Sequence, residues 1–511
     1  MMLWCGILAI VLQAADTPIL IINEDNSHFF GSRSADEMSI EGLNAFVDQY
    51  ANTKVTHLFL NPSAMRASYA SDVWDRIWDV GEQEVPEGNE FCQKWVDNAR
   101  LLHERGLDCY AVWIARCREK SISPWLSMRM NDIHDVDNPK NFMHNTFWVN
   151  HPEYWRVPGS TSGWTDRAYN YAIPEVREHH MALVRELLER YDPDGLELDW
   201  MRFGYHFAPG KEAEGAIILT DFMREVRQLA NTWAEKRGHP IQICARVPAH
   251  PDAAIGLGMD GITWAKEGLI DMLVPTPFWA TADFDIPVEL WRERLGDADA
   301  KVIVAPGQEV LLRASPGAEA VLNDLASTRG FAAAGWHRGA EAMYTFNYMD
   351  PAPILGGPAA YRQFLEAGLS RDVVFAKPRR HVITYRDTVP AGVSNGVQLP
   401  VGTDAPREFR LYTGPVTGPG DAAILIGLGA QDGLADVALN VSLNGAACAR
   451  LDDTWDLSRR AGAAELRAFA AAPPALQEGY NTIRVEPAAG NKTTAQIVWV
   501  EVHFGAREPD L

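Results

Sequence analysis

Eight short apolar runs recur through the N-terminal two thirds of the chain, and each is followed by a loop and a helical pattern. They lie at residues 18–23, 55–61, 107–114, 195–201, 241–247, 271–277, 301–307 and 342–348. Near-continuous apolarity is typical of strands buried on both faces of a parallel sheet. Two intervening helical patterns end on Gly106 and Gly238, where a left-handed C-cap favours glycine. The repeat predicts an α/β fold, a (β/α)8 TIM barrel over residues 16–370.

The pattern changes after Arg371. Short alternating runs such as FRLYTG, AAILIGLG and TTAQIVWVEVHF are separated by Gly, Pro and Asn turns. Such alternation is typical of antiparallel strands with one buried face. We therefore expect a C-terminal antiparallel β-sandwich over residues 371–511, an accessory domain that either binds carbohydrate or braces the barrel.

The composition and the N-terminal sequence limit which partners the protein can bind and where it is located. The 511 residues are 47% hydrophobic and 22% charged, and the net charge is −22. Phosphate contacts need clustered Lys and Arg, so no nucleic acid partner and no anionic membrane surface are expected. An apolar core from Leu3 to Leu12, followed by small residues near Ala15, is typical of a signal peptide over residues 1–15. We expect a secreted or periplasmic protein without membrane contact after leader removal; nothing in the sequence indicates an oligomeric state.

Residues 195–201, GLELDWM, place two carboxylates on one side of a buried strand. Strand alternation points Glu197, Asp199 and Met201 toward the barrel interior and the apolar residues between them toward the helices. Asp199 is nearer the carboxyl end, where barrel enzymes assemble their active sites. A buried carboxylate needs a partner or a function, and Arg202 is the expected partner. Asp199 is then either a catalytic group or an ion-paired residue that orders the barrel mouth.

The same stretch resembles the strand-four motif of glycoside hydrolase-like barrels of family 10 and its relatives, roughly Asp-Gly-x-x-x-Asp-Tyr-x-Arg-Phe/Tyr. The matching positions are Asp194, Gly195, Asp199, Trp200, Arg202 and Phe203. The stretches RMNDIHD (129–135) and NPSAMRASYASDVW (61–74) are similar to loops of the same group. The resemblance implies a glycosidase-like barrel and no particular sugar. A weaker likeness to family 18 chitinases puts Met201 where their catalytic glutamate stands, which argues against that mechanism.

Glycoside hydrolysis generally uses two carboxyl groups that flank the scissile bond. Asp199 is one candidate. Glu309, just past the seventh apolar run, is the favoured second group, and Asp283, past the sixth, is its competitor. Asp285 stands three residues before Val288 at a predicted helix start, so we expect it to cap that helix. The predicted catalytic residues are therefore Asp199, Glu309 and Asp283.

The longest connection is expected after the third apolar run, from residue 115 to 173. In a barrel, this loop lies on the carboxyl-end face with the active site. It contains Trp125, Trp148, Trp155 and Trp164. These rings either stack on sugars or pack the loop's own small core.

Further polar side chains follow the predicted strands and are expected to converge at the barrel mouth. Amide, arginine, histidine and tryptophan side chains suit hydroxyl-rich ligands, and the arginines also suit carboxylated or sulfated sugars. In the long loop, Asn131, Asp132 and His134 either bind substrate or order the loop itself. The predicted substrate-binding residues are Glu197, Arg202, Asn61, Arg66, Arg116, Asn131, His134, Arg246, Trp279, Asn347 and Tyr348.

No cofactor or metal is expected, because the sequence has no His-x-His pair on the first strand, no glycine-rich phosphate loop and no Gly-x-Ser-x-Gly elbow. We therefore expect a glycoside hydrolase that cleaves O-glycosidic bonds of a polysaccharide or oligosaccharide by two-carboxylate catalysis. The alternatives are a noncatalytic carbohydrate-binding barrel, or a polysaccharide lyase or deacetylase on a barrel. A lyase needs a Tyr or His base with a neutralising Arg, and a deacetylase needs a metal site.

Overall fold

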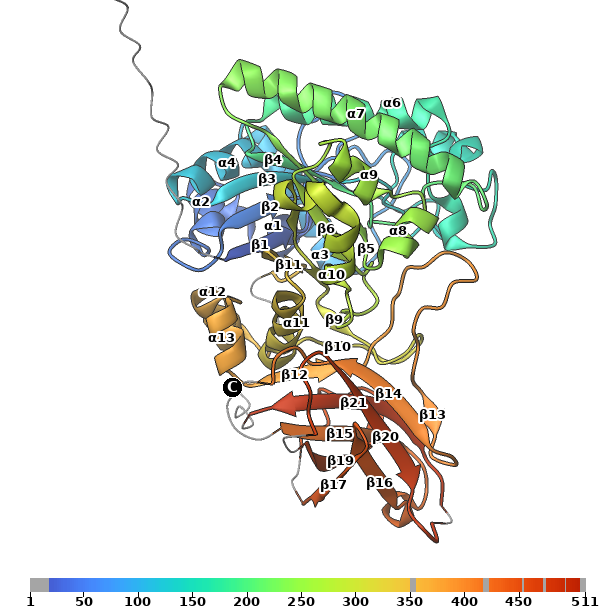
Figure 1. Cartoon of the computed structure of the whole chain (residues 1–511). Helices are drawn as coiled ribbons and strands as arrows, with labels where there is room; N and C mark the ends of the chain where they lie inside the picture. Colours follow the sequence, from blue (N-terminus) through green and yellow to red (C-terminus); the bar gives the residue numbers. More distant parts are fainter. Residues whose placement is uncertain are drawn as a thin grey trace, which may run out of the picture.

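The computed structural model places a barrel in the N-terminal part of the chain and a β-sandwich in the C-terminal part (Figure 1). It describes residues 18–349, 355–416, 422–452, 455–471, 475–491 and 493–505. The predicted leader, residues 1–15, lies outside these ranges. Within them, no helix is both long enough and apolar enough to cross a membrane.

The parallel strands form one sheet that closes on itself. Its order is β7-β6-β5-β4-β3-β2-β1-β11-β8. β7 and β8 are consecutive pieces of the predicted seventh strand, and they pair with β6 and β11 respectively, which closes the barrel. The predicted TIM barrel is therefore confirmed. The strand bounds are β1 Ile19–Glu24, β2 His57–Leu60, β3 Ser123–Arg129, β4 Gly195–Asp199, β5 Gln242–Pro248, β6 Met272–Thr276, β7 Ile303–Val304, β8 Gly307–Gln308 and β11 Ala342–Phe346.

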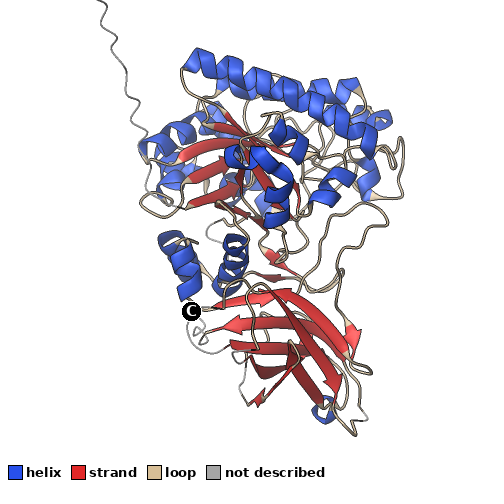
Figure 2. Ribbon diagram, viewed as in Figure 1, coloured by secondary structure: helices blue, strands red, loops and turns tan. Residues whose placement is uncertain are grey.

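Helices cover the outside of the barrel (Figure 2). The long helix predicted to end on Gly238 is α7, and Gly238 adopts the left-handed conformation with φ of 77° at its C-cap. The helices of the barrel region are α1 His28–Ser32, α2 Ile40–Asp48, α3 Glu90–Glu104, α4 Cys109–Glu119, α5 Thr146–Asn150, α6 Pro174–Arg190, α7 Glu212–Arg237, α8 Pro251–Gly256, α9 Gly261–Lys266, α10 Val288–Leu295, α11 Leu325–His337, α12 Pro358–Ala367 and α13 Arg371–Ala376.

The prediction of the third strand at residues 107–114 is wrong, because this segment begins helix α4. The Asp108 side chain accepts a hydrogen bond from the Ala111 backbone N–H and caps the helix at its first turn. The buried residues Tyr110, Trp113 and Cys117 follow a helical spacing. The true strand, β3, comes next, so the long loop on the carboxyl-end face spans residues 130–173.

The lower half of the barrel interior is apolar and aromatic. Trp125 of β3 stacks on Phe59 of β2, with ring centroids 4.7 Å apart. A Cβ atom at Gly195, the first residue of β4, would collide with the Trp125 ring, so packing requires the glycine of the β4 motif. The members of this interior cluster are Ile21, Phe59, Trp125, Cys244, Met272, Val274, Ala305, Ala342, Tyr344 and Phe346.

Two antiparallel sheets form the C-terminal sandwich, which is also as predicted. One has the order β12-β21-β15-β19-β18 with β13 beside β21, and the other has the order β14-β20-β16-β17. A small hairpin of β9 (Leu311–Leu312) and β10 (Val321–Leu322) precedes α11. The strand bounds are β12 Arg379–Val382, β13 Val401–Gly402, β14 Arg407–Tyr412, β15 Ala422–Gly429, β16 Leu439–Leu443, β17 Ala446–Cys448, β18 Arg450–Leu451, β19 Ala463–Ala471, β20 Tyr480–Pro487 and β21 Gln496–Phe504.

Barrel and sandwich meet where helix α11 packs on strand β12 (Figure 1). The backbone of Gly330 in α11 lies so close to the carbonyl of Arg380 that a Cβ atom would overlap it. Beside this contact, the buried Arg338 guanidinium donates to Asp285 of the barrel and, at 2.9 Å, to the Tyr480 hydroxyl of the sandwich. The two parts therefore share a closely packed interface with a buried hydrogen bond across it.

Gly330→Ala is expected to destabilise the protein by about 1 to 3 kcal/mol, because backbone atoms must move to admit the methyl group. Gly335→Ala in the same helix is the matched control. Its nearest new contact is the flexible end of Met343 at 2.9 Å, and alanine favours the helix by about 1 kcal/mol. Urea denaturation of both variants measures the difference, and equal losses of stability would contradict the close backbone approach.

Candidate active site

Charged side chains from three adjacent strands lie side by side at the carboxyl end of the barrel. Arg129 of β3 is in register with Asp199 of β4, which is in register with Arg246 of β5. Asp199 Oδ2 accepts from Arg246 Nη1 at 2.7 Å, and both side chains are 0% exposed. Its Oδ1 accepts from the Met201 backbone N–H at 3.1 Å. Asp199 therefore points inward as predicted, but its partner is Arg246 and not Arg202.

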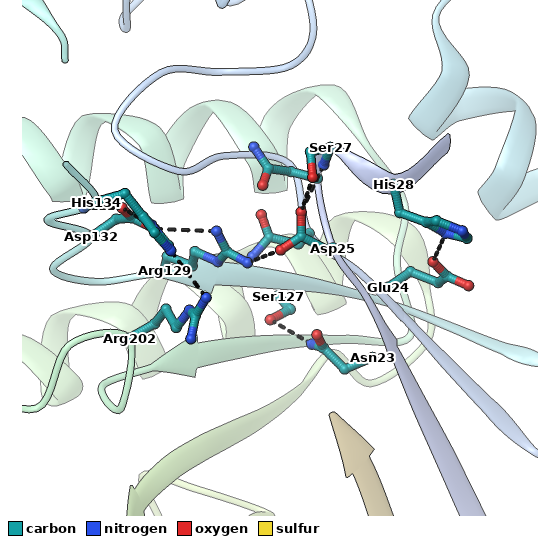
Figure 3. Close-up of polar contacts among 12 residues, drawn as sticks. Asn23, Glu24, Asp25, Ser27, His28, Ser127, Arg129, Asp132, His134 and Arg202 are labelled. Carbon is teal, nitrogen blue, oxygen red and sulfur yellow. Dashed lines mark hydrogen bonds and ion pairs between the residues drawn. The ribbon is translucent and has the colours of Figure 1, made fainter. Parts of the chain in front are cut away.

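A chain of ion pairs and hydrogen bonds runs from Asp25, just past β1, to Arg202, three residues past β4 (Figure 3). Asp25, just past β1, pairs with Arg129, whose Nη1 also donates to Asp132 Oδ2 at 3.1 Å. Asp132 accepts from His134 Nδ1 at 2.7 Å, and His134 Nε2 lies 3.2 Å from Arg202 Nη2. Because a guanidinium can only donate, His134 Nε2 is the acceptor and Nδ1 carries the proton to Asp132.

The first two carboxylates of this chain are held in the charged form. Burial by itself would raise the pKa of Asp25, but Arg129, two hydrogen bonds from Ser27 and nearby Arg202 hold it well below its usual range. Burial likewise opposes ionisation of Asp132, and His134, Arg129 and Arg202 outweigh it, so its pKa is also depressed. Both groups are therefore anions at neutral pH.

Glu197 lies one layer deeper in the barrel, and its pKa is raised where those of Asp25 and Asp132 are lowered. Its Oε1 accepts from Ser127 Oγ at 2.5 Å and from the Tyr344 hydroxyl at 2.9 Å, and it lies 3.5 Å from Asn23 Nδ2. Burial, and then repulsion from Asp199, raise the pKa of Glu197 to about 7, although Arg246 lowers it. Near neutral pH the Glu197 carboxyl is therefore only partly ionised, and its hydrogen bonds hold it below Asp199 in the barrel.

Glu309 follows β8 and is the second predicted catalytic residue. Its carboxyl is buried, Oε1 accepts from the Val310 backbone N–H at 3.0 Å, and Oε2 has no hydrogen-bond partner among the described residues. Burial raises its pKa to about 8, against the lowering influence of Arg202 and Arg246. The negative charges of Asp199 and Glu309 both raise the pKa of Arg246. Asp199 is therefore ion-paired with Arg246, whereas Glu309 interacts with the same arginine only electrostatically and is protonated at neutral pH.

Several buried polar atoms at the strand ends have no hydrogen-bond partner in the described part of the chain. Such atoms are costly in a folded protein unless a ligand or water satisfies them. They come from β1, β3, β5 and from residues just past β4, β8 and β11, so they converge on one face of the barrel. They are Asn23 Oδ1, Arg129 Nε, Arg202 Nε, Arg246 Nε and Nη2, Glu309 Oε2 and Asn347 Oδ1.

A cavity of about 690 Å³ opens at this face, and aromatic rings line much of it. Trp164 of the long loop stacks nearly parallel on Phe278, with centroids 6.1 Å apart. Polar groups enter from His134 and Arg202. Phe203, which follows β4, and the exposed Trp279, which follows β6, also line the cavity. Flat rings beside hydrogen-bonding groups suit the two faces of a sugar ring.

The four tryptophans of the predicted long loop lie in three different places. Trp164 lines the cavity. Trp148 and Trp155 stack on each other at 4.8 Å and pack the loop itself. Trp125 belongs to β3 and lies inside the barrel. Only Trp164 of these four therefore lines the cavity. The spacing of the tryptophans in the sequence does not single it out.

The C-terminal part of the chain braces one wall of the cavity. Asp387 accepts hydrogen bonds from the backbone N–H groups of Phe278, Trp279 and Ala280, at 2.8, 3.0 and 2.9 Å. These residues form the loop after β6, so a carboxylate near the sandwich fixes the aromatic wall. The bracing role that was one of two expectations for the C-terminal domain has this direct support.

Other predicted substrate-binding residues act on the loops. Arg66 is buried and donates to the backbone carbonyl of His144 from Nε and Nη2, at 3.0 and 2.8 Å. Asn131 donates to the carbonyls of Tyr169 and Tyr205. Asn61 accepts from the backbone of Ser63, and Tyr348 is buried with its hydroxyl 3.1 Å from Thr328 Oγ1. These contacts order the mouth, and they do not test a role in substrate binding.

Two predicted placements, those of Arg116 and Asp285, are wrong, whereas Asp283 lies past β6 as predicted. Arg116 lies on helix α4 and pairs with Asp48 at 2.6 Å, because the third strand is elsewhere. Asp283 sits between barrel and sandwich, 3.9 Å from Arg386, and burial raises its pKa to about 6. Asp285 does not cap α10, whose N-cap has no side-chain hydrogen bond, and pairs with Arg338 instead.

Sequence reasoning missed Arg129, which links Asp25 to Asp132. The signal was present in the heptapeptide SPWLSMR, an alternating run that ends on the arginine. Once the third strand was placed too early, this run became part of a loop. In the described ranges, no group of three or more His, Cys, Asp or Glu side chains is arranged to hold a metal.

No family model and no curated protein matches the chain. Solved structures with a similar arrangement include α-L-fucosidase isoenzyme 1 from Paenibacillus thiaminolyticus, with 12% identity, a TM-score of 0.35, and coverage of 92% of this chain and 97% of that one. An α-galactosidase from Thermus thermophilus has 16% identity, a TM-score of 0.36, and coverage of 72% of this chain and 64% of that one.

A cycloisomaltooligosaccharide glucanotransferase from Paenibacillus sp. has 10% identity and a TM-score of 0.35 over 96% of this chain. This chain spans 58% of the length of the glucanotransferase. Similarities at this level carry no argument about activity. The sheet order of this chain by itself defines the barrel.

Glu197→Gln is expected to stabilise the protein relative to wild type increasingly as the pH rises. Between the ordinary glutamate pKa of 4.5 and the folded value of about 7, the folded state of the wild type binds more protons than the unfolded state. Its stability then falls with rising pH, by up to about 1.4 kcal/mol per pH unit for one proton.

Urea denaturation at pH 5 and pH 7.5 measures this effect, and Glu235→Gln on the exposed face of α7 is the control. A constant difference between Glu197→Gln and wild type at both pH values would contradict the buried, proton-sharing role.

Proposed function

We propose that the protein is a glycoside hydrolase in which Glu309 donates a proton to the leaving glycosidic oxygen. The observation that carries this proposal is the buried Glu309 carboxyl at the barrel mouth, with one oxygen fixed by the Val310 N–H and the other unpaired among the described residues. A general acid must be protonated at the working pH and free to donate. The raised pKa of about 8 supports the first requirement, and the unpaired Oε2 supports the second.

Asp199 is proposed as the charged partner in the same reaction. Its carboxylate is tied to Arg246, the arginine that also lies near Glu309. A negative charge held there can stabilise the positive charge that develops on the sugar ring, or activate water. Asp25 is the competitor, because it is also an anion at the strand ends and its side chain is 14% exposed.

Three earlier expectations remain part of this proposal. The family 10-like interpretation of the β4 motif is retained for Asp199, at the carboxyl end of β4, and for Arg202, which lines the cavity, whereas Asp194 precedes the strand and accepts a hydrogen bond from Ser123 Oγ. Export through the N-terminal leader is proposed from its sequence pattern alone. A polysaccharide or oligosaccharide substrate is supported by the aromatic cavity.

A second candidate function, β-elimination on an acidic polysaccharide, is favoured by one observation. His134 presents Nε2 as an acceptor at the cavity, oriented by Asp132 and beside Arg202. In that reaction Nε2 takes the proton from C5 of a uronic acid and the electron pair forms the C4=C5 double bond. The C4–O bond then breaks, and its oxygen takes a proton from Glu309. Hydrolysis yields saturated products, whereas elimination yields an unsaturated uronide that absorbs in the ultraviolet.

Glu309→Gln is expected to lower kcat about 10²- to 10⁴-fold on glycosides with poor leaving groups. Aryl glycosides with an acidic phenol should lose far less, because their leaving group needs no proton. Wild-type activity should decline as the pH rises through about 8, where Glu309 loses its proton. This alkaline limb should be absent from the variant.

Steady-state kinetics on both substrate types, with exposed Glu104→Gln as the matched control, measure these effects. An equal loss on both types of substrate, with the alkaline limb retained, would remove Glu309 from the role of acid.

Asp199→Asn and Asp25→Asn separate the two candidates for the charged partner. We expect the larger fall in kcat from Asp199→Asn, with circular dichroism spectra confirming that both variants remain folded. A larger fall from Asp25→Asn would contradict the assignment of Asp199.

A further inference from the structure

Arg202 differs from the other two arginines of the mouth. Arg129 is paired with Asp25 and Asp132, and Arg246 is paired with Asp199. Arg202 is only 7% exposed, yet within the described ranges it forms no ion pair with a carboxylate. Of its five N–H donors, one has a hydrogen-bond partner there, His134 Nε2. A buried guanidinium with this few acceptors is costly unless a ligand supplies them.

Three phenylalanine rings surround the Arg202 guanidinium and attract its charge without accepting hydrogen bonds. The rings of Phe346, Phe203 and Phe278 lie 5.3, 5.6 and 5.7 Å from the guanidinium carbon. Their faces attract the cation but accept none of its N–H groups in the plane. Nε is buried and has no partner among the described residues. Burial, and then repulsion from Arg129, lower the pKa of Arg202, as expected of a cation whose charge is not fully compensated.

We propose that Arg202 binds an anionic substituent of the sugar, either the carboxylate of a uronic acid or a sulfate ester, at the floor of the aromatic cavity. The planar guanidinium fork matches the two oxygens of a carboxylate or sulfate. Arg202 also lines the cavity beside Trp164 and Phe278, so the bound sugar ring can stack while its acidic group reaches the cation. This inference deepens the proposed function by naming the substrate class.

The other charges that face the cavity leave room for an anion. His134 accepts from Arg202 at Nε2 and donates to Asp132 from Nδ1, and Asp132 shares Arg129 with Asp25. At the rim, Asp137 pairs with Arg167 at 2.9 Å and Asp135 accepts from Asn141 at 2.9 Å. The net charge of −22 acts over longer distances, where salt screens charges beyond about 8 to 10 Å.

The test is binding by calorimetry to the Glu309→Gln protein, which holds saccharides without turnover under the proposed mechanism. The probes are oligogalacturonides, oligomannuronides and sulfated oligosaccharides, each beside its carboxyl-reduced or desulfated counterpart. We expect one acidic class to bind about 10- to 100-fold more tightly than its neutral counterpart, the range for charge-assisted hydrogen bonds. Which class it is distinguishes carboxylate from sulfate.

Adding Arg202→Met should remove this preference, so that acidic and neutral saccharides bind within about twofold, whereas Arg202→Lys should retain part of it. Arg224→Met on helix α7, which removes an exposed cation paired with Glu267, is the charge-matched control and should change nothing. Thermal melts show whether each variant is folded.

A preference that survives Arg202→Met in folded protein would overturn the proposal, as would the absence of any acidic preference across the panel. These outcomes concern binding alone. Failure of the hydrolase proposal would instead appear as retained turnover by Glu309→Gln, so the two failures are distinguishable.

Discussion

The ion pair between Asp199 and Arg246 is the interaction on which the site depends. Both side chains are fully buried in the barrel, and the carboxylate is held on its second oxygen by the Met201 N–H. Such a pair is stable only when its geometry and hydrogen bonds offset the loss of hydration. Because adjacent parallel strands bring the two residues into register, the barrel itself sets that geometry.

The other charged groups at the mouth are paired unevenly. Asp25 and Asp132 share Arg129, whereas Glu197 and Glu309 have no salt-bridge partner in the described part of the chain and are raised in pKa to about 7 and about 8. Arg202 is left among aromatic rings without a carboxylate there. In the proposed function, Glu309 is the proton donor and Arg202 is the cation that binds an acidic group of the sugar.

Local patterns predicted the fold well, and long-range partners could not be predicted. Glu197 and Asp199 face inward because alternation in a five-residue strand is a local property. The third strand was misplaced because the apolar run after Asp108 fits a capped helix as well as a strand. Arg246 is 47 residues from Asp199 in the chain, so only the assembled register, not the neighbouring Arg202, identifies the true partner. The capping role expected for Asp285 was wrong because its partners, Arg338 and Tyr480 of the sandwich, lie far along the chain.

The central claim is that the barrel mouth keeps Glu309 protonated at neutral pH while its neighbours are ion-paired. Infrared difference spectroscopy of wild type against Glu309→Gln resolves the carbonyl stretch of that one protonated carboxyl. The account predicts that this band is present at pH 7 and disappears with a midpoint at about 8. A midpoint near the ordinary glutamate value of 4.5, with the band absent at pH 7, would contradict it.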